Sequence, residues 1–302
     1  MRDFAPAAGL RWLILGQPAK IASNPDLSRA LSSILPGARL DAYAASTGAD
    51  LRLIPRAAVG GYAYGTLYLA ELSAADGARV RDAFAGRLRG GGIVKQPRAG
   101  IFRVSGTDGE VPLALVSVED RLIASVSGDP TLARVVAAYA EGRLRSPTAL
   151  RGAALSSLPT PPDDALATFY APGPFEGAWA TAASGLLSSA FALSITAEAR
   201  SPALLRFTVT LAGDWPEREV PPELMLERSW VLLANSSTGR LLALDQARNL
   251  KSTRHLQYLT LSMEIPMLEL ARGVRAATSA NLSEILEVIP QELESTPRLP
   301  RP

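Results

Sequence analysis

His255 is the only histidine in this 302-residue chain, and the chain contains no cysteine. A catalytic triad that needs imidazole would have to use His255, while a metal site with several histidine or thiolate ligands is excluded. His255 lies in the polar stretch Lys-Ser-Thr-Arg-His-Leu, which leads into an apparent strand. We therefore interpret it as a surface or sheet-edge histidine.

Two other stretches carry residue types that could do chemistry. Ser236–Arg240 offers hydroxyl groups without a visible base, so a serine nucleophile lacks the partner that would activate it. Gly90-Gly91-Gly92 has basic neighbours, but it follows a helix and lacks the Gly-Lys-Ser/Thr sequence of a phosphate-binding loop, so a helix end is the better interpretation. A hydrolase that uses Ser236–Arg240 and His255 remains the alternative function.

Three tyrosines, Tyr62, Tyr64 and Tyr68, gather on a glycine-rich hairpin. They could line a pocket or an interface, although tyrosine also packs well on a half-buried strand. Gly60-Gly61 in the same hairpin indicates a bulge or a close approach of the backbone. We predict these tyrosines as the ligand- or partner-binding residues, with no catalytic residue, metal or cofactor.

The composition limits the classes of partner. Of 31 basic residues, three are lysines and 31 − 3 = 28 are arginines, but they are scattered among 29 acids and the net charge is only +2. A nucleic-acid partner is therefore not expected. The chain is 47% hydrophobic, yet no apolar run approaches the roughly 20 residues of a transmembrane span. The first residues do not form a signal peptide, which suggests a trimmed start.

The stretch Leu113–Tyr139 predicts a strand, a tight turn at Glu119-Asp120, a second strand and a helix. Asp129 and Pro130 are typical of a helix start. The apolar residues Leu132, Val135, Val136 and Tyr139 then form one helical stripe, so we expect Val135 to be buried against the hairpin.

The order of predicted elements repeats on both sides of a proline-rich linker around Pro161-Pro162. Alternation in the later strands, such as Leu193, Ile195 and Ala197 against Ser194, Thr196 and Glu198, predicts an antiparallel sheet with one solvated face. We therefore expect an α+β fold of two similar lobes, each a mainly antiparallel sheet covered by helices on one face. The lobes are residues 1–158 and 164–290, a possible internal repeat, and residues 291–302 form a disordered proline-rich tail.

The segments Ala58–Leu72, Leu113–Tyr139 and Tyr170–Trp179 make the chain resemble uncharacterised bacterial cell-envelope proteins, often lipoproteins, with two similar α+β lobes. The resemblance implies a periplasmic or outer-membrane-anchored location, with the cytoplasm as the alternative, and a non-enzymatic role. It supplies no functional residues. The function we expect is binding of a partner protein or an apolar ligand.

Replacing His255 with alanine tests its assignment to the surface. We expect the free energy of unfolding to stay within about 0.5 kcal/mol of the unmodified protein, as is usual for surface substitutions. Thermal or urea melts measure this. A loss of several kcal/mol, or of a bound metal, would contradict the assignment.

Overall fold

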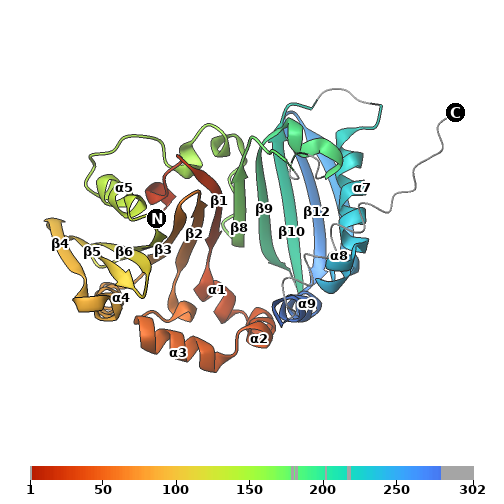
Figure 1. The fold of residues 1–302 in the computed structure, drawn as a ribbon. Helices are drawn as coiled ribbons and strands as arrows, with labels where there is room; N and C mark the ends of the chain where they lie inside the picture. Colours follow the sequence, from red (N-terminus) through yellow and green to blue (C-terminus); the bar gives the residue numbers. More distant parts are fainter. Residues whose placement is uncertain (1, 178–179, 181–182, 201–202, 216–218, 280–302) are drawn as a thin grey trace.

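The computed structural model describes residues 2–177, 180, 183–200, 203–215 and 219–279. Within these residues, twelve strands form one antiparallel sheet in the order β11-β12-β10-β9-β8-β1-β2-β3-β7-β6-β5-β4 (Figure 1). The chain thus has an α+β fold, as its sequence predicts. The strands are β1 (Leu10–Gly16), β2 (Arg56–Tyr62), β3 (Gly65–Glu71), β4 (Ile93–Arg98), β5 (Ile101–Asp108), β6 (Val111–Val118), β7 (Leu122–Gly128), β8 (Ala165–Pro172), β9 (Ala190–Arg200), β10 (Leu204–Gly213), β11 (Arg248–His255) and β12 (Tyr258–Pro266).

Helices connect these strands in a similar order in the two halves of the chain. Each half has a strand, a helical segment, a hairpin, a helical segment, further strands and a last helix. This order agrees with the predicted duplication, but the repeat and the division into residues 1–158 and 164–290 stay predictions. The helices are α1 (Pro18–Ser23), α2 (Pro25–Ile34), α3 (Gly37–Thr47), α4 (Ala74–Arg87), α5 (Thr131–Ala140), α7 (Pro222–Asn235), α8 (Ser237–Leu241) and α9 (Met267–Ser279), with short 3-10 turns η2 (Leu51–Leu53), η6 (Ala183–Ser189) and η7 (Leu244–Gln246) among the connections.

Strand β1 joins the two halves. It pairs with β2 on one side and with β8 on the other, so that Leu13 lies opposite both Gly60 and Tyr170. The predicted sheets of the two lobes are therefore one continuous sheet. A second junction forms where α2 packs against α9, with Leu27 of α2 and Met267 of α9 in one hydrophobic cluster. The predicted tail at 291–302 lies outside the described residues.

The register assigns the side chains of the sheet to two faces. Residues directly opposite each other in antiparallel strands point to the same side. Leu15, Ala58 and Leu69 thus share one side, which we call the Leu69 face. On the other side, which we call the Tyr68 face, one row crosses ten strands: Leu261, Val209, Ile195, Phe169, Ile14, Val59, Tyr68, Ser125, Leu115 and Val104.

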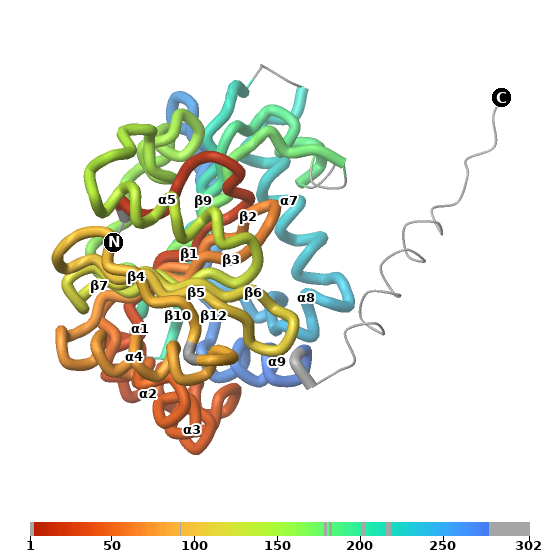
Figure 2. Tube along the Cα trace, turned by 60° about the vertical axis from the view of Figure 1, so that its left-hand side comes forward, coloured from red at the N-terminus to blue at the C-terminus, as the bar shows by residue number. Residues whose placement is uncertain are grey.

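Helices cover both faces of the sheet, which corrects the expectation of helices on one face. Helix α5 packs on the Leu69 face, where its Val136 and Ala137 share a cluster with Leu67 and Val126. Helix α4 packs on the Tyr68 face of β5, β6 and β7, and α7 packs on the same face at the other end of the sheet. Figure 2 shows α5 and α4 on opposite sides of strands β4 to β7. Burial from both sides is the reason that Ala114–Ser117 is buried at every residue and does not alternate.

The face of β9 and β10 that was predicted to be solvated is largely buried. Ser194 and Thr196 are only 5% and 7% exposed, and they lie opposite Thr210 and Thr208. Cross-strand pairs of such short side chains shield one another. Glu198 is also buried, and Arg200 donates to its carboxylate at 3.0 Å.

Local signals at turns and helix starts are confirmed. The Asn24 side chain accepts hydrogen bonds from two backbone N–H groups at the start of α2. The Asp129 carboxylate accepts one from the backbone N–H of Thr131 at the start of α5. Glu119 and Asp120 both have positive φ, at 52° and 51°, as the two central residues of a type I′ turn require, and the backbone N–H of Arg121 donates to the carbonyl oxygen of Val118 at 3.0 Å.

The predicted stripe on α5 has the right spacing but the wrong phase. Val136 is completely buried against the sheet together with Ala133 and Ala137, whereas Val135 is only half-buried. Small alanine side chains let the helix axis approach the sheet closely, and this turns the longer side chains on the neighbouring side, Leu132, Val135 and Tyr139, toward a cavity.

This phase predicts a contrast between two neighbouring valines. Val136→Asp should lower the free energy of unfolding by several kcal/mol, because the new carboxylate is desolvated without a partner. Val135→Asp should cost clearly less, because its carboxylate can stay hydrated at the cavity. Urea denaturation of both variants, with Arg134→Ala as a control that should change little, measures the difference. An equal loss of unfolding free energy in Val135→Asp and Val136→Asp would contradict this assignment.

Candidate hydrophobic binding site

The β2–β3 hairpin separates the three predicted tyrosines. Tyr68 lies on the Tyr68 face and is 47% exposed. Tyr62 lies on the other side of the sheet and is 7% exposed, while Tyr64 stands in the two-residue turn and is 78% exposed. One hairpin therefore contributes to two different pockets, one on each side of the sheet.

Gly60 and Gly61 let aromatic rings lie directly on this hairpin, which confirms the predicted close approach. A Cβ on Gly61 would be 2.2 Å from the indole of Trp12, and a Cβ on Gly60 would be 3.0 Å from the ring of Tyr62. The register of β1 also shifts between Leu10 and Trp12. Any larger side chain at Gly61 would displace Trp12 from β2.

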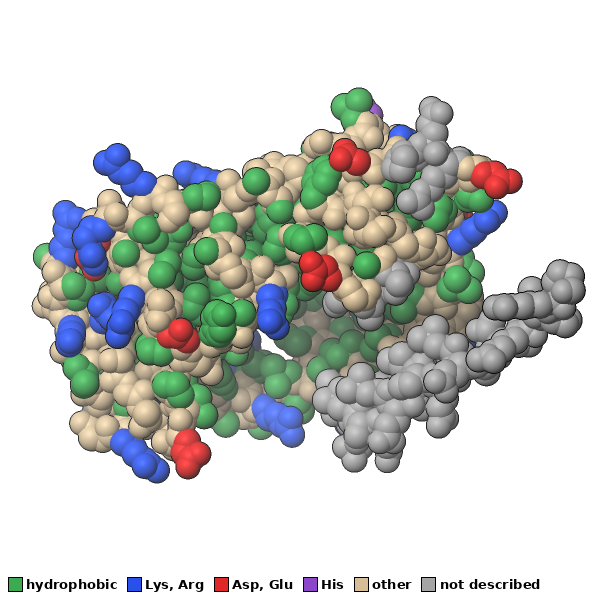
Figure 3. Space-filling view, turned by 45° about the horizontal axis from the view of Figure 1, so that its top comes forward, with side chains coloured by type: hydrophobic (Ala, Val, Ile, Leu, Met, Phe, Trp, Pro, Cys, Tyr) green, Lys and Arg blue, Asp and Glu red, His purple; other side chains and the backbone are tan. Residues whose placement is uncertain are grey.

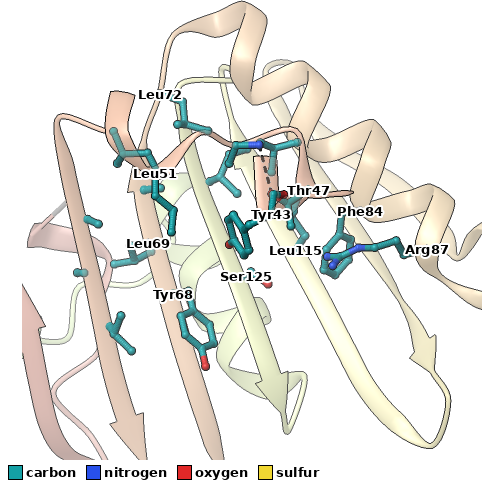
Figure 4. A pocket seen from close by; sticks show the side chains of 18 residues that line it. Tyr43, Thr47, Leu51, Tyr68, Leu69, Leu72, Phe84, Arg87, Leu115 and Ser125 are labelled. Carbon is teal, nitrogen blue, oxygen red and sulfur yellow. Dashed lines mark hydrogen bonds between the residues drawn. The ribbon is translucent and has the colours of Figure 1, made fainter. Parts of the chain in front are cut away.

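A pocket of about 200 Å³, which we call the hydrophobic pocket, opens on the Tyr68 face of β2, β3, β6 and β7 (Figure 4). Its floor includes Val59, Tyr68, Ser125 and Leu115, which are consecutive members of the row that crosses the sheet. Its walls come from α3, η2 and α4, and among the labelled side chains are Tyr43, Leu51 and Phe84.

Helix α4 is held firmly against the sheet. Gly77 lies so close to the β6–β7 turn that a Cβ there would be 1.7 Å from the carbonyl oxygen of Asp120. The Asp120 carboxylate accepts two hydrogen bonds from Arg81 of α4, at 2.6 and 2.8 Å, and a third from the Ser117 hydroxyl at 2.7 Å. These contacts fix the wall that carries Phe84.

Helix α3 forms a looser wall. Of its residues only Leu40 and Thr47 are buried, and Tyr43 is 44% exposed beside the pocket. The Thr47 hydroxyl donates to the carbonyl oxygen of Tyr43 at 2.7 Å and accepts from the backbone N–H of Ala49. Gly48 ends the helix with φ 75°, and a Cβ there would be 3.0 Å from the backbone of Arg79 in α4. Glycine is therefore needed where the two walls meet.

Next to the pocket, the same face of the sheet is partly exposed. Ile14, the next member of the row beyond Val59, is 38% exposed, and Phe169 beside it is half-buried. In the space-filling view, hydrophobic side chains lie on the floor of a hollow in the molecular surface (Figure 3). An apolar surface of this kind on a folded protein commonly marks a binding site.

A second cavity of about 430 Å³, which we call the tyrosine pocket, lies beside α5 and the hairpin turn. Tyr62, Tyr64 and Tyr139 line it with Leu132 and Val135. The Tyr62 hydroxyl donates to the carbonyl oxygen of Pro6 at 2.9 Å, and the Tyr139 hydroxyl donates to that of Pro147 at 3.3 Å. Burial raises the pKa of the Tyr62 hydroxyl well above its ordinary value. Tyr62 therefore holds the N-terminal segment in place.

The residues of the alternative hydrolase lie apart. The Ser236 hydroxyl caps α8 by accepting from the backbone N–H of Gly239 at 3.0 Å. The chain enters β11 from η7, which packs on α8, and His255 is the exposed last residue of that strand. Eight residues of strand span roughly 23 Å from first to last Cα. The structure thus gives no support to a shared site.

The residues predicted from the sequence include Tyr68 of this candidate pocket but not Tyr43, Phe84, Arg87 or Leu115, which also line it. These come from three distant elements, and no local motif connects them. Within the described residues no group of three histidine or acidic side chains could hold a metal ion. Among the same residues no helix is both long and apolar enough to cross a membrane.

The comparisons with known proteins give a structural likeness only. No protein-family model matches the chain, and no curated protein matches it. The chain is similar to solved structures of TP0453. Crystal form I aligns with a TM-score of 0.48 at 10% identity, covering 91% of this chain and 97% of that one. Crystal form IV aligns with a TM-score of 0.49 at 12% identity, covering 91% and 96%.

The different surroundings of Tyr62 and Tyr64 predict different effects of the same substitution. Tyr62→Phe should lower the free energy of unfolding by about 1 kcal/mol, because the buried carbonyl oxygen of Pro6 loses its hydrogen bond. Tyr64→Phe should leave stability unchanged. Urea melts of the two variants measure the difference, and an unchanged stability of Tyr62→Phe would show that its hydroxyl is dispensable.

Proposed function

We propose that this protein binds an apolar ligand in the hydrophobic pocket and does not transform it chemically. The observation that carries the proposal is a concave apolar site with a floor of four strands and walls of α3, η2 and α4, with Tyr43 and Tyr68 still 44% and 47% exposed. Ligand sites are typically concave and mostly apolar, with a few polar groups. The concave shape and the volume of about 200 Å³ favour a small ligand over a partner protein.

The size of the pocket indicates the size of the group that enters it. An apolar cavity of about 150 Å³ in another protein binds benzene, so a pocket of about 200 Å³ accepts one or two aromatic rings or a short alkyl chain. The uncovered surface around Ile14 offers room for a longer ligand to continue. Each apolar contact would remove hydrophobic surface of the ligand and of the pocket from water, and this would stabilise the complex.

The polar groups in the pocket fit binding better than catalysis. The Thr47 hydroxyl is engaged by the backbone of α3. Ser125 is a second hydroxyl on the floor, but neither His255 nor any carboxylate is among the described residues that line the pocket. A serine nucleophile needs such a base within hydrogen-bond reach.

Ligand binding is tested with N-phenyl-1-naphthylamine, a neutral dye that fluoresces strongly in apolar surroundings. We expect saturable binding to the unmodified protein and a loss of at least about tenfold in affinity for Ser125→Phe, which fills the pocket from its floor. Ser127→Phe places the same ring two residues along the same face of β7, outside the pocket, and should bind like the unmodified protein.

Two results would refute the proposal. One is the absence of saturable binding by the unmodified protein, and the other is equal binding by Ser125→Phe and Ser127→Phe. Far-UV circular dichroism and thermal melts of both variants establish that each is folded before the titrations are compared.

We also propose that the protein acts in the bacterial cell envelope, as the resemblance of Ala58–Leu72, Leu113–Tyr139 and Tyr170–Trp179 to envelope proteins implies. Fractionation of the bacterium that makes the protein, followed by detection with an antibody, tests this. Recovery with periplasm or membrane supports the proposal, and recovery with the cytoplasm alone refutes it.

A further inference from the structure

We propose that the ligand of the hydrophobic pocket carries a negatively charged group, which Arg87 binds at the edge of the pocket. This inference rests on the proposed function and adds the chemical class of the ligand, an apolar body with one carboxylate, sulfonate or phosphate. It follows from the position, contacts and charge of a single side chain.

Arg87 is the last residue of α4, and its side chain reaches the pocket (Figure 4). Its guanidinium carbon lies 5.7 Å from the centre of the Phe84 ring. Within the part of the chain that the structure describes, this is its only specific contact, and no carboxylate pairs with it. The guanidinium is therefore positioned beside the pocket with its hydrogen-bond donors available.

The other two arginines of α4 both form ion pairs within the protein. Arg79 forms an ion pair with Asp76, one turn away. Arg81 forms two hydrogen bonds with Asp120 and lies 4.5 Å from the centre of the Phe102 ring. The helix dipole favours a basic residue in the last turn, but it does not require that residue to line an apolar pocket.

The charge on the described lining of the pocket is positive. Arg87 is the only charged side chain among the described residues that line it, and no aspartate or glutamate is present to neutralise it. A cationic ligand would be repelled, and a neutral one would gain no attraction from the guanidinium, which is exposed to water. A guanidinium presents paired N–H donors that match the oxygens of a carboxylate, sulfonate or phosphate. An apolar ligand with an anionic end satisfies both parts of the site.

A matched pair of dyes isolates the charge. 8-Anilinonaphthalene-1-sulfonate and N-phenyl-1-naphthylamine share the same aromatic body, and only the first carries a sulfonate. We expect Arg87→Gln to weaken binding of the sulfonate dye about fivefold, the upper range for an exposed ion pair, and to change binding of the neutral dye less than twofold. Arg89→Gln, which removes a nearby exposed arginine that does not line the pocket, should change neither affinity.

Competition extends the test to a simpler amphiphile. Octanoate and octanol are compared by the concentration of each that displaces the neutral dye. The ratio of these concentrations in Arg87→Gln measures the difference in hydrophobicity between the two compounds. Relative to that ratio, the unmodified protein should favour octanoate. The preference for octanoate should fall in Arg87→Gln and weaken at high salt, because an exposed ion pair is screened.

The outcomes separate this inference from the proposed function. If the neutral dye binds in the pocket but the sulfonate dye loses no affinity in Arg87→Gln, the anionic ligand class is wrong and apolar binding stands. If Ser125→Phe leaves binding of both dyes unchanged, the pocket is not the site and both proposals fail. If Arg87→Gln and Arg89→Gln weaken the sulfonate dye equally, the effect is general surface charge and the specific role of Arg87 is refuted.

Discussion

The pairing of β1 with both β2 and β8 is the constraint on which the rest of the structure depends. β1 lies near the middle of the sheet, and Leu13 on it is 1% exposed. Because opposite residues share a side, this pairing continues one alternation of side chains from the first half of the chain into the second. A shift by one residue would exchange the two faces in one half. The hydrophobic row from Leu261 to Val104 would then be broken.

The same alternation lets one short hairpin serve both sides of the sheet. Tyr62 is directed to the Leu69 face, where its hydroxyl holds Pro6, and Tyr68 is directed to the hydrophobic pocket. Gly60 and Gly61 make this possible because they leave space for the rings of Tyr62 and Trp12 against the backbone. The hairpin thus places a structural contact on one face of the sheet and the pocket-lining Tyr68 on the other.

The two helical walls of the pocket differ in how strongly they are held. Helix α4 is fixed by the contact of Gly77 with the β6–β7 turn and by the bond of Arg81 to Asp120. Helix α3 buries little; Gly48 at its end lies against α4, and an exposed hydrogen bond from Arg52 to Asp41 links it to η2. The firmly held α4 carries Arg87, and the lightly packed α3 carries Tyr43. This difference fits the proposed site, in which Arg87 has a fixed position and the wall at Tyr43 can adapt to the apolar part of a ligand.

The sequence by itself determined the α+β class, the cap at Asn24 and the turn at Glu119-Asp120, because neighbouring residues decide each of these. It did not predict the edge strands β4 and β11, whose exposed polar residues show no hydrophobic alternation. Periodicity also predicted the spacing of the stripe on α5. It could not determine which side of the helix faces the sheet, and packing of Ala133 and Ala137 buried Val136 in place of Val135. Only the tertiary structure joined the halves into one sheet, separated Tyr62 from Tyr68 and brought Tyr43, Phe84 and Leu115 around one pocket. Pairing between distant strands decides those positions, and no local pattern encodes such pairing.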